Sequence, residues 1–281
     1  MRAIGLMFSL VVFAGCGGAM TELDGGSDGG AARDAGVRRD GGLGGTDGGM
    51  DGGARDGGGV DAGPRDAGPN HVPMVGADIL ANRTTVYAGQ VVDLALGVTD
   101  EDGDFLQFTW SGPGTFFENG NPSAQRWFSA ELASPTTVTL SVSVTDGRSA
   151  PITRQIMINV TVPRFTDVYA NILAVAPLQG GQCVGCHGTM GMFQIAGTKN
   201  GAYTQLVNAP HNRGAGCVSA GVPSMVVPGD VQRSLVYRKM SSTQPMACGD
   251  GMPAMSMVVP ASPLQFIVTV GSWIRAGALN D

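Results

Sequence analysis

Aromatic and charged side chains are both scarce in this sequence. Phe, Trp and Tyr make up 6% of its residues, Asp, Glu, Lys and Arg make up 14%, and the formal net charge is −6. A Gly- and Asp-rich stretch near the amino end dilutes the aromatic residues and carries most of the negative charge, so the remainder is close to neutral. Nucleic-acid binding needs a basic surface. We therefore expect no nucleic-acid partner.

Long apolar runs are also missing. The run at residues 4–13 follows a positive charge at Arg2, which is the usual plan of an export signal, and it is too short to span a bilayer as a mature helix. It leads into VFAGC, which resembles the bacterial lipobox. The resemblance implies a signal peptide at residues 1–15 and a lipidated Cys16. An ordinary cleaved signal is the alternative.

The residue after Cys16 indicates where such a lipoprotein would reside. Gly17 differs from the Asp that retains lipoproteins in the inner membrane of some bacteria, so we expect a lipid anchor in the outer membrane of the cell envelope. Two or three acyl chains anchor a protein far more firmly than one. The exported chain would face the periplasm or the medium, both of which favour disulfides over free thiols.

Large apolar residues are nearly absent from residues 16–70, where Gly, Asp, Ala and Arg recur. Such a segment cannot bury enough surface to offset the entropy lost on ordering. We predict a disordered, flexible linker with a root-mean-square span on the order of 40 Å.

Alternating apolar and polar residues dominate residues 71–163. The pattern appears in VVDLALGV, FLQFTW, TVTLSVSV and ITRQIMINVTV, and it predicts half-buried antiparallel strands in an immunoglobulin-like β-sandwich with Trp110 in its core. These strands and the acidic turn between them resemble PKD-type (polycystic-kidney-disease) and cadherin-like extracellular modules. No nucleophile is accompanied by a base here, so we interpret the module as a spacer or docking unit.

The acidic turn DEDGD at residues 100–104 raises the question of calcium. It lacks the glycine position and the distal glutamate of an EF-hand loop. An isolated turn of this kind usually only reverses the chain, and calcium is the alternative.

Helical spacing of apolar residues replaces the strand pattern in residues 164–281. We expect helices at residues 165–173, at residues 202–207, in a segment capped by Asp230, and in a last segment capped by Ser262 and ended by Gly277.

The sequence has only five cysteines, and two of them lie in the pentapeptide CVGCH at residues 183–187. C-x-x-C-H is the attachment signature of c-type haem, in which both thiols bind the porphyrin and the histidine binds the iron. A zinc site would need two further ligands in a compact unit, and a thioredoxin-type dithiol would follow a strand. We therefore predict one covalent haem c at Cys183 and Cys186, with His187 as the proximal iron ligand.

Further motifs follow in order: PGD at residues 228–230, LVYRK at 235–239, CGDGMP at 248–253 and WIRAGA at 273–278. Together with CVGCH they resemble a family of exported cytochrome-c-like domains of bacterial lipoproteins. The resemblance implies a mostly α-helical haem domain at residues 164–281.

The same resemblance implies that Met252 is the distal iron ligand. The chain has 14 methionines, and a methionine is more often core filler than ligand. Met246, Met255 and Met257 are therefore alternatives, as is His211 in a bis-histidine iron. Tyr237 and Trp273 either contact the haem or are plain core residues.

Cys217 and Cys248 then remain as a pair in an oxidising compartment, and we predict a disulfide between them. The whole chain is expected to be a multidomain, lipid-anchored monohaem cytochrome that transfers single electrons to unidentified redox proteins of the cell envelope. Two alternatives stay open. One is a surface adhesion or sensor lipoprotein whose sandwich binds a partner, and the other is a peroxidase-like enzyme.

Overall fold

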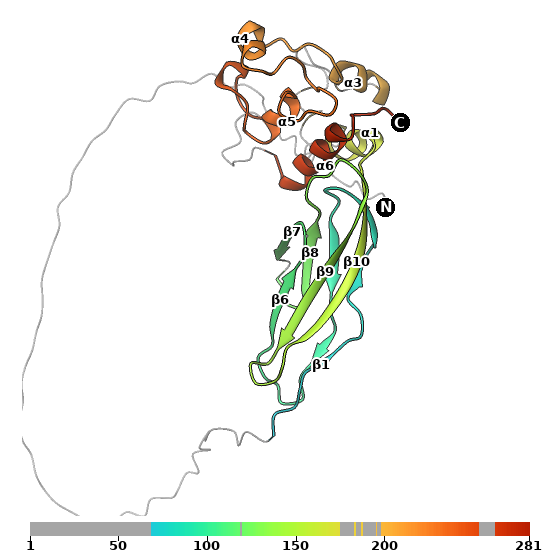
Figure 1. Ribbon diagram of the computed structural model, residues 1–281, viewed down its shortest axis with the longest axis vertical. Helices are drawn as coiled ribbons and strands as arrows, with labels where there is room; N and C mark the ends of the chain where they lie inside the picture. The colour runs from blue at the N-terminus through green and yellow to red at the C-terminus, as the bar shows by residue number, and fades with distance from the viewer. Residues whose placement is uncertain are drawn as a thin grey trace, which may run out of the picture. The chain divides into compact units, whose positions relative to one another are not determined.

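A computed structural model of the chain describes residues 69–118, 120–174, 183, 187, 195, 198–252 and 262–281. The strands among these residues form two four-stranded sheets (Figure 1). The first sheet has the order β3-β10-β9-β6, with bounds Thr85–Tyr87, Ile152–Thr161, Thr136–Thr145 and Gln107–Ser111. The second has the order β2-β4-β8-β7, with bounds Leu80–Ala81, Val92–Ala95, Ala124–Phe128 and Thr115–Glu118. A small pair, β1 (Met74–Val75) and β5 (Val98–Thr99), accompanies them.

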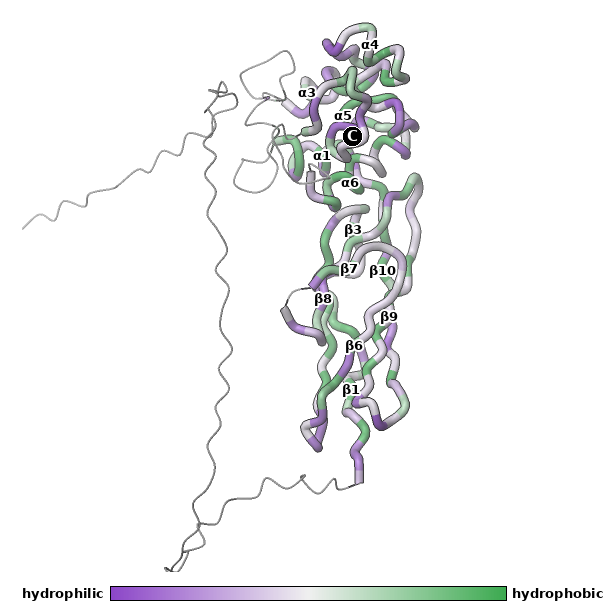
Figure 2. Tube along the Cα trace, turned by 90° about the vertical axis from the view of Figure 1, so that its left-hand side faces the viewer, coloured by the Kyte–Doolittle hydropathy of each residue, from purple (hydrophilic) through white to green (hydrophobic). Residues whose placement is uncertain are grey.

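The predicted β-sandwich is confirmed by how the two sheets bury their apolar side chains. In β9, Leu140, Val142 and Val144 are at most 1% exposed and alternate with less buried residues. Figure 2 shows hydrophobic and hydrophilic positions following one another along the strands. Burying one such side chain contributes about 1.5–3 kcal/mol. The fully buried side chains of this core include Val92, Leu94, Trp127, Leu140, Val142 and Ile158.

Two details of the sandwich differ from the expectation. Strand β3 pairs with β10 in parallel. The chain reaches β3 directly from β2, which belongs to the second sheet. Trp110 is only partly buried, and its indole N–H donates to the carbonyl of Pro122. The core tryptophan is Trp127, which is 0% exposed and donates to the carbonyl of Pro113.

Helices follow the last strand. Helix α1 (Phe165–Val168) continues directly into the π-helical turn η1 (Tyr169–Leu173). The other helical elements among the described residues are α3 (Lys199–Leu206), α4 (Gly214–Ser219), α5 (Leu235–Met240), the 3-10 turn η3 (Met246–Cys248) and α6 (Leu264–Arg275). None of the helices in this described part has the length and apolar character to cross a membrane.

The ends of the helices follow the sequence in one case and depart from it in two. Gly277 has φ 102° and ends α6, with Gly277 N–H donating to Ile274 and Ala278 N–H donating to Trp273. Ser262 does not cap α6, because its hydroxyl donates to the carbonyl of Met252. Asp230 accepts from two N–H groups of the turn before α5, and α5 itself begins at Leu235.

Helices α1, α3 and α6 share an apolar core built around aromatic side chains. The Phe165 ring lies 5.1 Å from the Trp273 ring and 5.2 Å from the Tyr203 ring, measured between centroids. Ile172, Leu206 and Ile274 are each at most 2% exposed in the same cluster. The sandwich and these helices belong to one compact unit, Gly68–Asp281.

Candidate functional site

The described part of the CVGCH motif lies beside the helical core. Cys183 and His187 both have helical backbone and are partly buried. Cys183 packs against the aromatic and aliphatic core cluster. Burial raises the pKa of its thiol to about 11. The carbonyl of His187 accepts a 2.7 Å hydrogen bond from the N–H of Ile195, which is 2% exposed in the same core. This bond fastens the end of the motif to the core.

Several predicted site residues lie outside the described residues. They are Cys16, Cys186, Met255 and Met257.

Met252 is partly buried, and its backbone is held at both ends. Its N–H donates to the carbonyl of Lys239 in α5 at 2.9 Å, and its carbonyl accepts from the hydroxyl of Ser262 at 2.9 Å. The residue is therefore connected to α5 and to the segment that leads into α6. The backbone of Met252 thus has a restricted range of positions.

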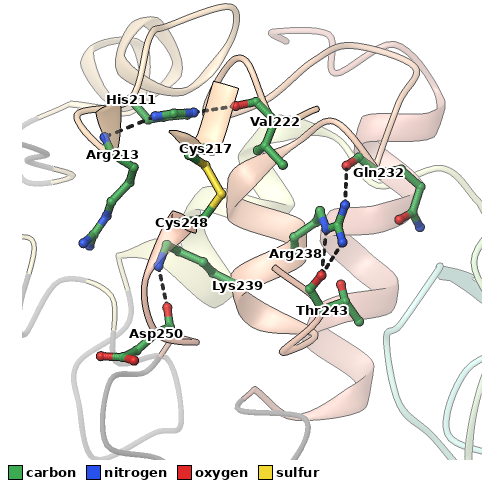
Figure 3. The surroundings of a disulfide bond; sticks show 10 residues. All are labelled: His211, Arg213, Cys217, Val222, Gln232, Arg238, Lys239, Thr243, Cys248 and Asp250. Carbon is green, nitrogen blue, oxygen red and sulfur yellow. Dashed lines mark hydrogen bonds between the residues drawn. A yellow bond between two sulfur atoms is a disulfide. The ribbon is translucent and has the colours of Figure 1, made fainter. Parts of the chain in front are cut away.

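Lys239 also holds, through its side chain, the loop that carries Met252, which follows Cys248 at the end of η3. It is only 5% exposed, and its ammonium donates to the carbonyl of Asp250 (Figure 3). Burial, and after it the nearby Arg213, lower the pKa of Lys239 to about 8, while Asp250 opposes the shift. The sequence motif LVYRK contains this lysine, but its spacing gave no sign that the amine is buried.

A disulfide between Cys217 and Cys248 closes the other end of the loop, as predicted (Figure 3). Both cysteines are 0% exposed and pack with Val222 and Leu235 in a small core of their own. Because Cys248 lies only four positions before Met252, the disulfide restrains the loop from α4, while Lys239 restrains it from α5.

Two of the alternative iron ligands can be placed. His211 has both ring nitrogens engaged: Nδ1 accepts from the N–H of Arg213 at 3.2 Å, and Nε2 donates to the carbonyl of Val222 at 2.6 Å. Met246 is 97% exposed at the start of η3. Met252 is thus more restrained than Met246 and, unlike His211, lies in the loop that Lys239 and the disulfide fasten.

The two aromatic residues whose roles the sequence left open have different surroundings. Trp273 is a core residue, 2% exposed, and its indole N–H donates to the carbonyl of Leu279. The hydroxyl of Tyr237 donates to the carboxylate of Glu131, which lies in the sandwich half of the chain.

The acidic turn brings three carboxylates together: oxygens of Asp100, Asp102 and Asp104 lie within 4.8 Å of one another. Two of the three have basic partners, since Asp102 pairs with His71 at 2.7 Å and Asp104 with Arg148 at 3.2 Å. The hydrogen bond to Asp102 raises the pKa of His71, and the same bond lowers the pKa of Asp102. These ion pairs, together with a hydrogen bond from the Asp104 N–H to Asp100, give the turn a structural role in fixing the loop before β6.

No family model matches the chain, and no curated protein matches it. Among solved structures it is similar to the PKD1 domain of Vibrio anguillarum Epp, at 23% identity over 34% of this chain and 100% of that one, with a TM-score of 0.24. It is also similar to a nucleoside hydrolase-related hypothetical protein from Saccharophagus degradans, at 22% identity over 33% of this chain, with a TM-score of 0.24. The tandem Ig repeats of Dlar match at 12% identity over 34% of this chain and 52% of that one, with a TM-score of 0.25.

The matched part spans only 26% of the Saccharophagus degradans chain. All of these TM-scores are far below 0.5, so the assignment of the sandwich rests on the strand pairing of this chain itself.

Proposed function

We propose that this chain is a lipid-anchored monohaem c-type cytochrome that carries single electrons in the cell envelope. The observation that carries the proposal is the CVGCH motif, whose thiol at Cys183 packs against an apolar core while Met252 is held in a fastened loop. The lipid anchor at Cys16 and the outer-membrane location rest on the lipobox-like sequence. The partners would be redox proteins of the envelope.

The donor set fits a c-type haem. A thiol at the edge of an apolar cluster, an imidazole four residues later and a partly buried thioether are the groups that attach and ligate this cofactor. Cys183 and Cys186 would hold the porphyrin covalently, and His187 and Met252 would bind the iron. A haem held in this way supplies reversible one-electron chemistry at its iron.

The role of the surrounding residues is to keep Met252 in one position. Lys239 binds Asp250 through its amine and Met252 through its carbonyl, and the disulfide fixes Cys248. A restrained Met252 thioether would remain bound to the iron and leave no open site for a peroxidase substrate. This arrangement favours electron transfer over the peroxidase-like alternative.

The experiment that tests the distal ligand compares two methionine variants of the exported, haem-loaded protein. Met252→Ala should abolish the weak sulphur-to-iron charge-transfer band and lower the reduction potential, because thioether ligation favours ferrous iron. Met246→Ala is the matched control, since Met246 is 97% exposed, and it should keep both properties. A charge-transfer band that survives in Met252→Ala would contradict the assignment of this ligand.

A further inference from the structure

Helix α6 is buried on two sides by different parts of the chain. Ile267, Val270 and Ile274 belong to the helical core, whereas Val268 packs against the core of the sandwich. An amphipathic helix at the surface buries only one stripe. Helix α6 instead forms the boundary between the two apolar cores.

Polar groups on α6 bind the backbone of the sandwich half. The hydroxyl of Thr269 donates to the carbonyl of Ala88 at 3.0 Å, and the hydroxyl of Ser272 accepts from the N–H of Leu132 at 3.0 Å. Thr269 and Ser272 are at most 3% exposed. Buried backbone groups need such partners, because an unpaired buried donor or acceptor destabilises the fold.

Two glycines allow this close approach. A Cβ on Gly89 would lie 2.2 Å from the Thr269 hydroxyl and 2.3 Å from the Gln265 carbonyl. A Cβ on Gly271 would lie 2.6 Å from the carboxyl carbon of Glu131 and 2.8 Å from the Tyr237 ring. The contact therefore leaves no room for a larger residue on either side.

Glu131 joins the sandwich half to both α5 and α6 through its side chain. Its Oε1 accepts from the hydroxyl of Tyr237 at 2.6 Å, and its Oε2 accepts from Nε of Arg275 at 2.8 Å. The Glu131 side chain is 18% exposed. Bonds to a charged group of this kind are about twice as strong as neutral ones. Burial, together with the bond to Glu131, raises the pKa of Tyr237 to about 12, so the hydroxyl remains a donor throughout the neutral range.

Helix α5 connects the Glu131 contact to the loop that carries Met252. Tyr237 and Lys239 lie two residues apart in the six-residue helix α5, and the carbonyl of Lys239 accepts the N–H of Met252. A shift of α5 at Tyr237 would therefore move the acceptor that holds Met252.

We propose that Glu131 is a positioning residue through which the β-sandwich fixes α5, α6 and the loop that carries Met252. The sandwich is then a structural part of the helical domain rather than a spacer. The effect on the iron rests on the proposed function, whereas the effect on the polypeptide does not.

The first test is hydrogen exchange of the full chain, which needs no haem. Glu131→Ala should speed exchange in α5 and at Met252 by about tenfold or more, since it removes a charged acceptor from two donors. Glu118→Ala, which removes an exposed glutamate from β7, should leave these amides unchanged. Tyr237→Phe removes only a hydroxyl, keeps the ring, and should accelerate the same amides to a smaller extent. Unchanged exchange at α5 and Met252 in both Glu131→Ala and Tyr237→Phe would overturn the proposal.

The second test uses the haem-loaded protein. Glu131→Ala should weaken the methionine-to-iron band and lower the reduction potential, and Glu131→Gln, which keeps an acceptor for Tyr237, should restore part of both. An unchanged band and potential in Glu131→Ala would overturn the positioning role. If the protein carries no haem but the exchange result holds, the proposed function fails while the coupling of the sandwich to α5 stands.

Discussion

Asp146, at the turn between β9 and β10, shows how one carboxylate can organise a hairpin. Its Oδ1 accepts from the N–H groups of Ser149 and Arg148 at 2.7 and 2.8 Å, and its Oδ2 accepts from the amide of Asn70 at 2.9 Å. The backbone bond from Ser149, followed by the bond from Asn70, holds the pKa of this carboxyl well below its usual range. Gly147, with φ 79°, completes the turn.

A pH dependence of stability follows from this turn. Because the folded-state pKa of Asp146 is depressed, its contribution is present above the unfolded value of about 4 and is lost as the pH falls below it. Asp146→Asn should therefore lower the urea midpoint at pH 7, and the difference from the parent protein should shrink at pH 3. A difference that stays constant between these two pH values would contradict the prediction.

At this scale the sequence predicted some roles and missed others. CVGCH predicts haem roles for Cys183 and His187 because the motif is local and chemically specific, and those roles stay predictions. The strand pattern predicted Trp110 in the core; it packs against the sandwich core but stays partly buried, whereas Trp127, which the pattern did not single out, is 0% exposed. The sequence also gave no sign that the Ser262 hydroxyl binds the carbonyl of Met252 instead of capping α6, because a serine followed by a proline is a common start of a helix.

Among the elements, the disulfide is one of the restraints on the segment that leads from η3 to Met252. Cys217 and Cys248 are 31 positions apart. In the chain-entropy model, closing a loop of this length stabilises the fold by about 3–4 kcal/mol. The double variant Cys217→Ser, Cys248→Ser should lose about this much in the free energy of unfolding measured with urea. A loss below about 1 kcal/mol would show that the covalent link adds little to the packing around it.

Helix α6 offers a test of its tight contact with the sandwich half. Alanine is the better helix former by up to about 1 kcal/mol, yet Gly271→Ala should destabilise the protein by about 1–3 kcal/mol, because the new methyl group meets Glu131 and Tyr237. Gly216→Ala in α4 is the matched control. Its Cβ would meet only the Ala247 methyl group, at 3.4 Å.

Thermal unfolding of the two glycine variants checks this expectation. Gly216→Ala should be neutral or stabilising. An equally neutral Gly271→Ala would mean that the helix and the sandwich half are not in firm contact.

The elements themselves were partly predictable. The four strand patterns of the sequence correspond to β4 with β5, β6, β9 and β10. Strands β7 (TFFE) and β8 (AQRWF) were missed, since neither alternates and each follows a Gly- and Pro-containing segment. The contact between Glu131 and Tyr237 joins residues 106 positions apart, and no local pattern contains that information.

For the whole molecule, the lipid anchor is the feature that would decide its location. Residues 16–70 lie outside the described residues, apart from Pro69 and Asn70, so the anchor and linker stay predictions. Cys16→Ser should move the protein from washed membranes into the soluble fraction, because the rest of the sequence holds no apolar segment long enough to insert. Retention of this variant in the washed membrane fraction would contradict the prediction.

Covalent haem is the central claim, and the mass of the intact, denatured protein tests it most directly. The protein would be exported in a host with haem-attachment machinery, then denatured and extracted with organic solvent. Thioether bonds survive this treatment, so the account predicts the mass of the polypeptide plus one haem, and polypeptide alone in a Cys183→Ala, Cys186→Ala double variant. A parent protein that has the mass of the bare polypeptide would contradict the assignment of this chain as a c-type cytochrome.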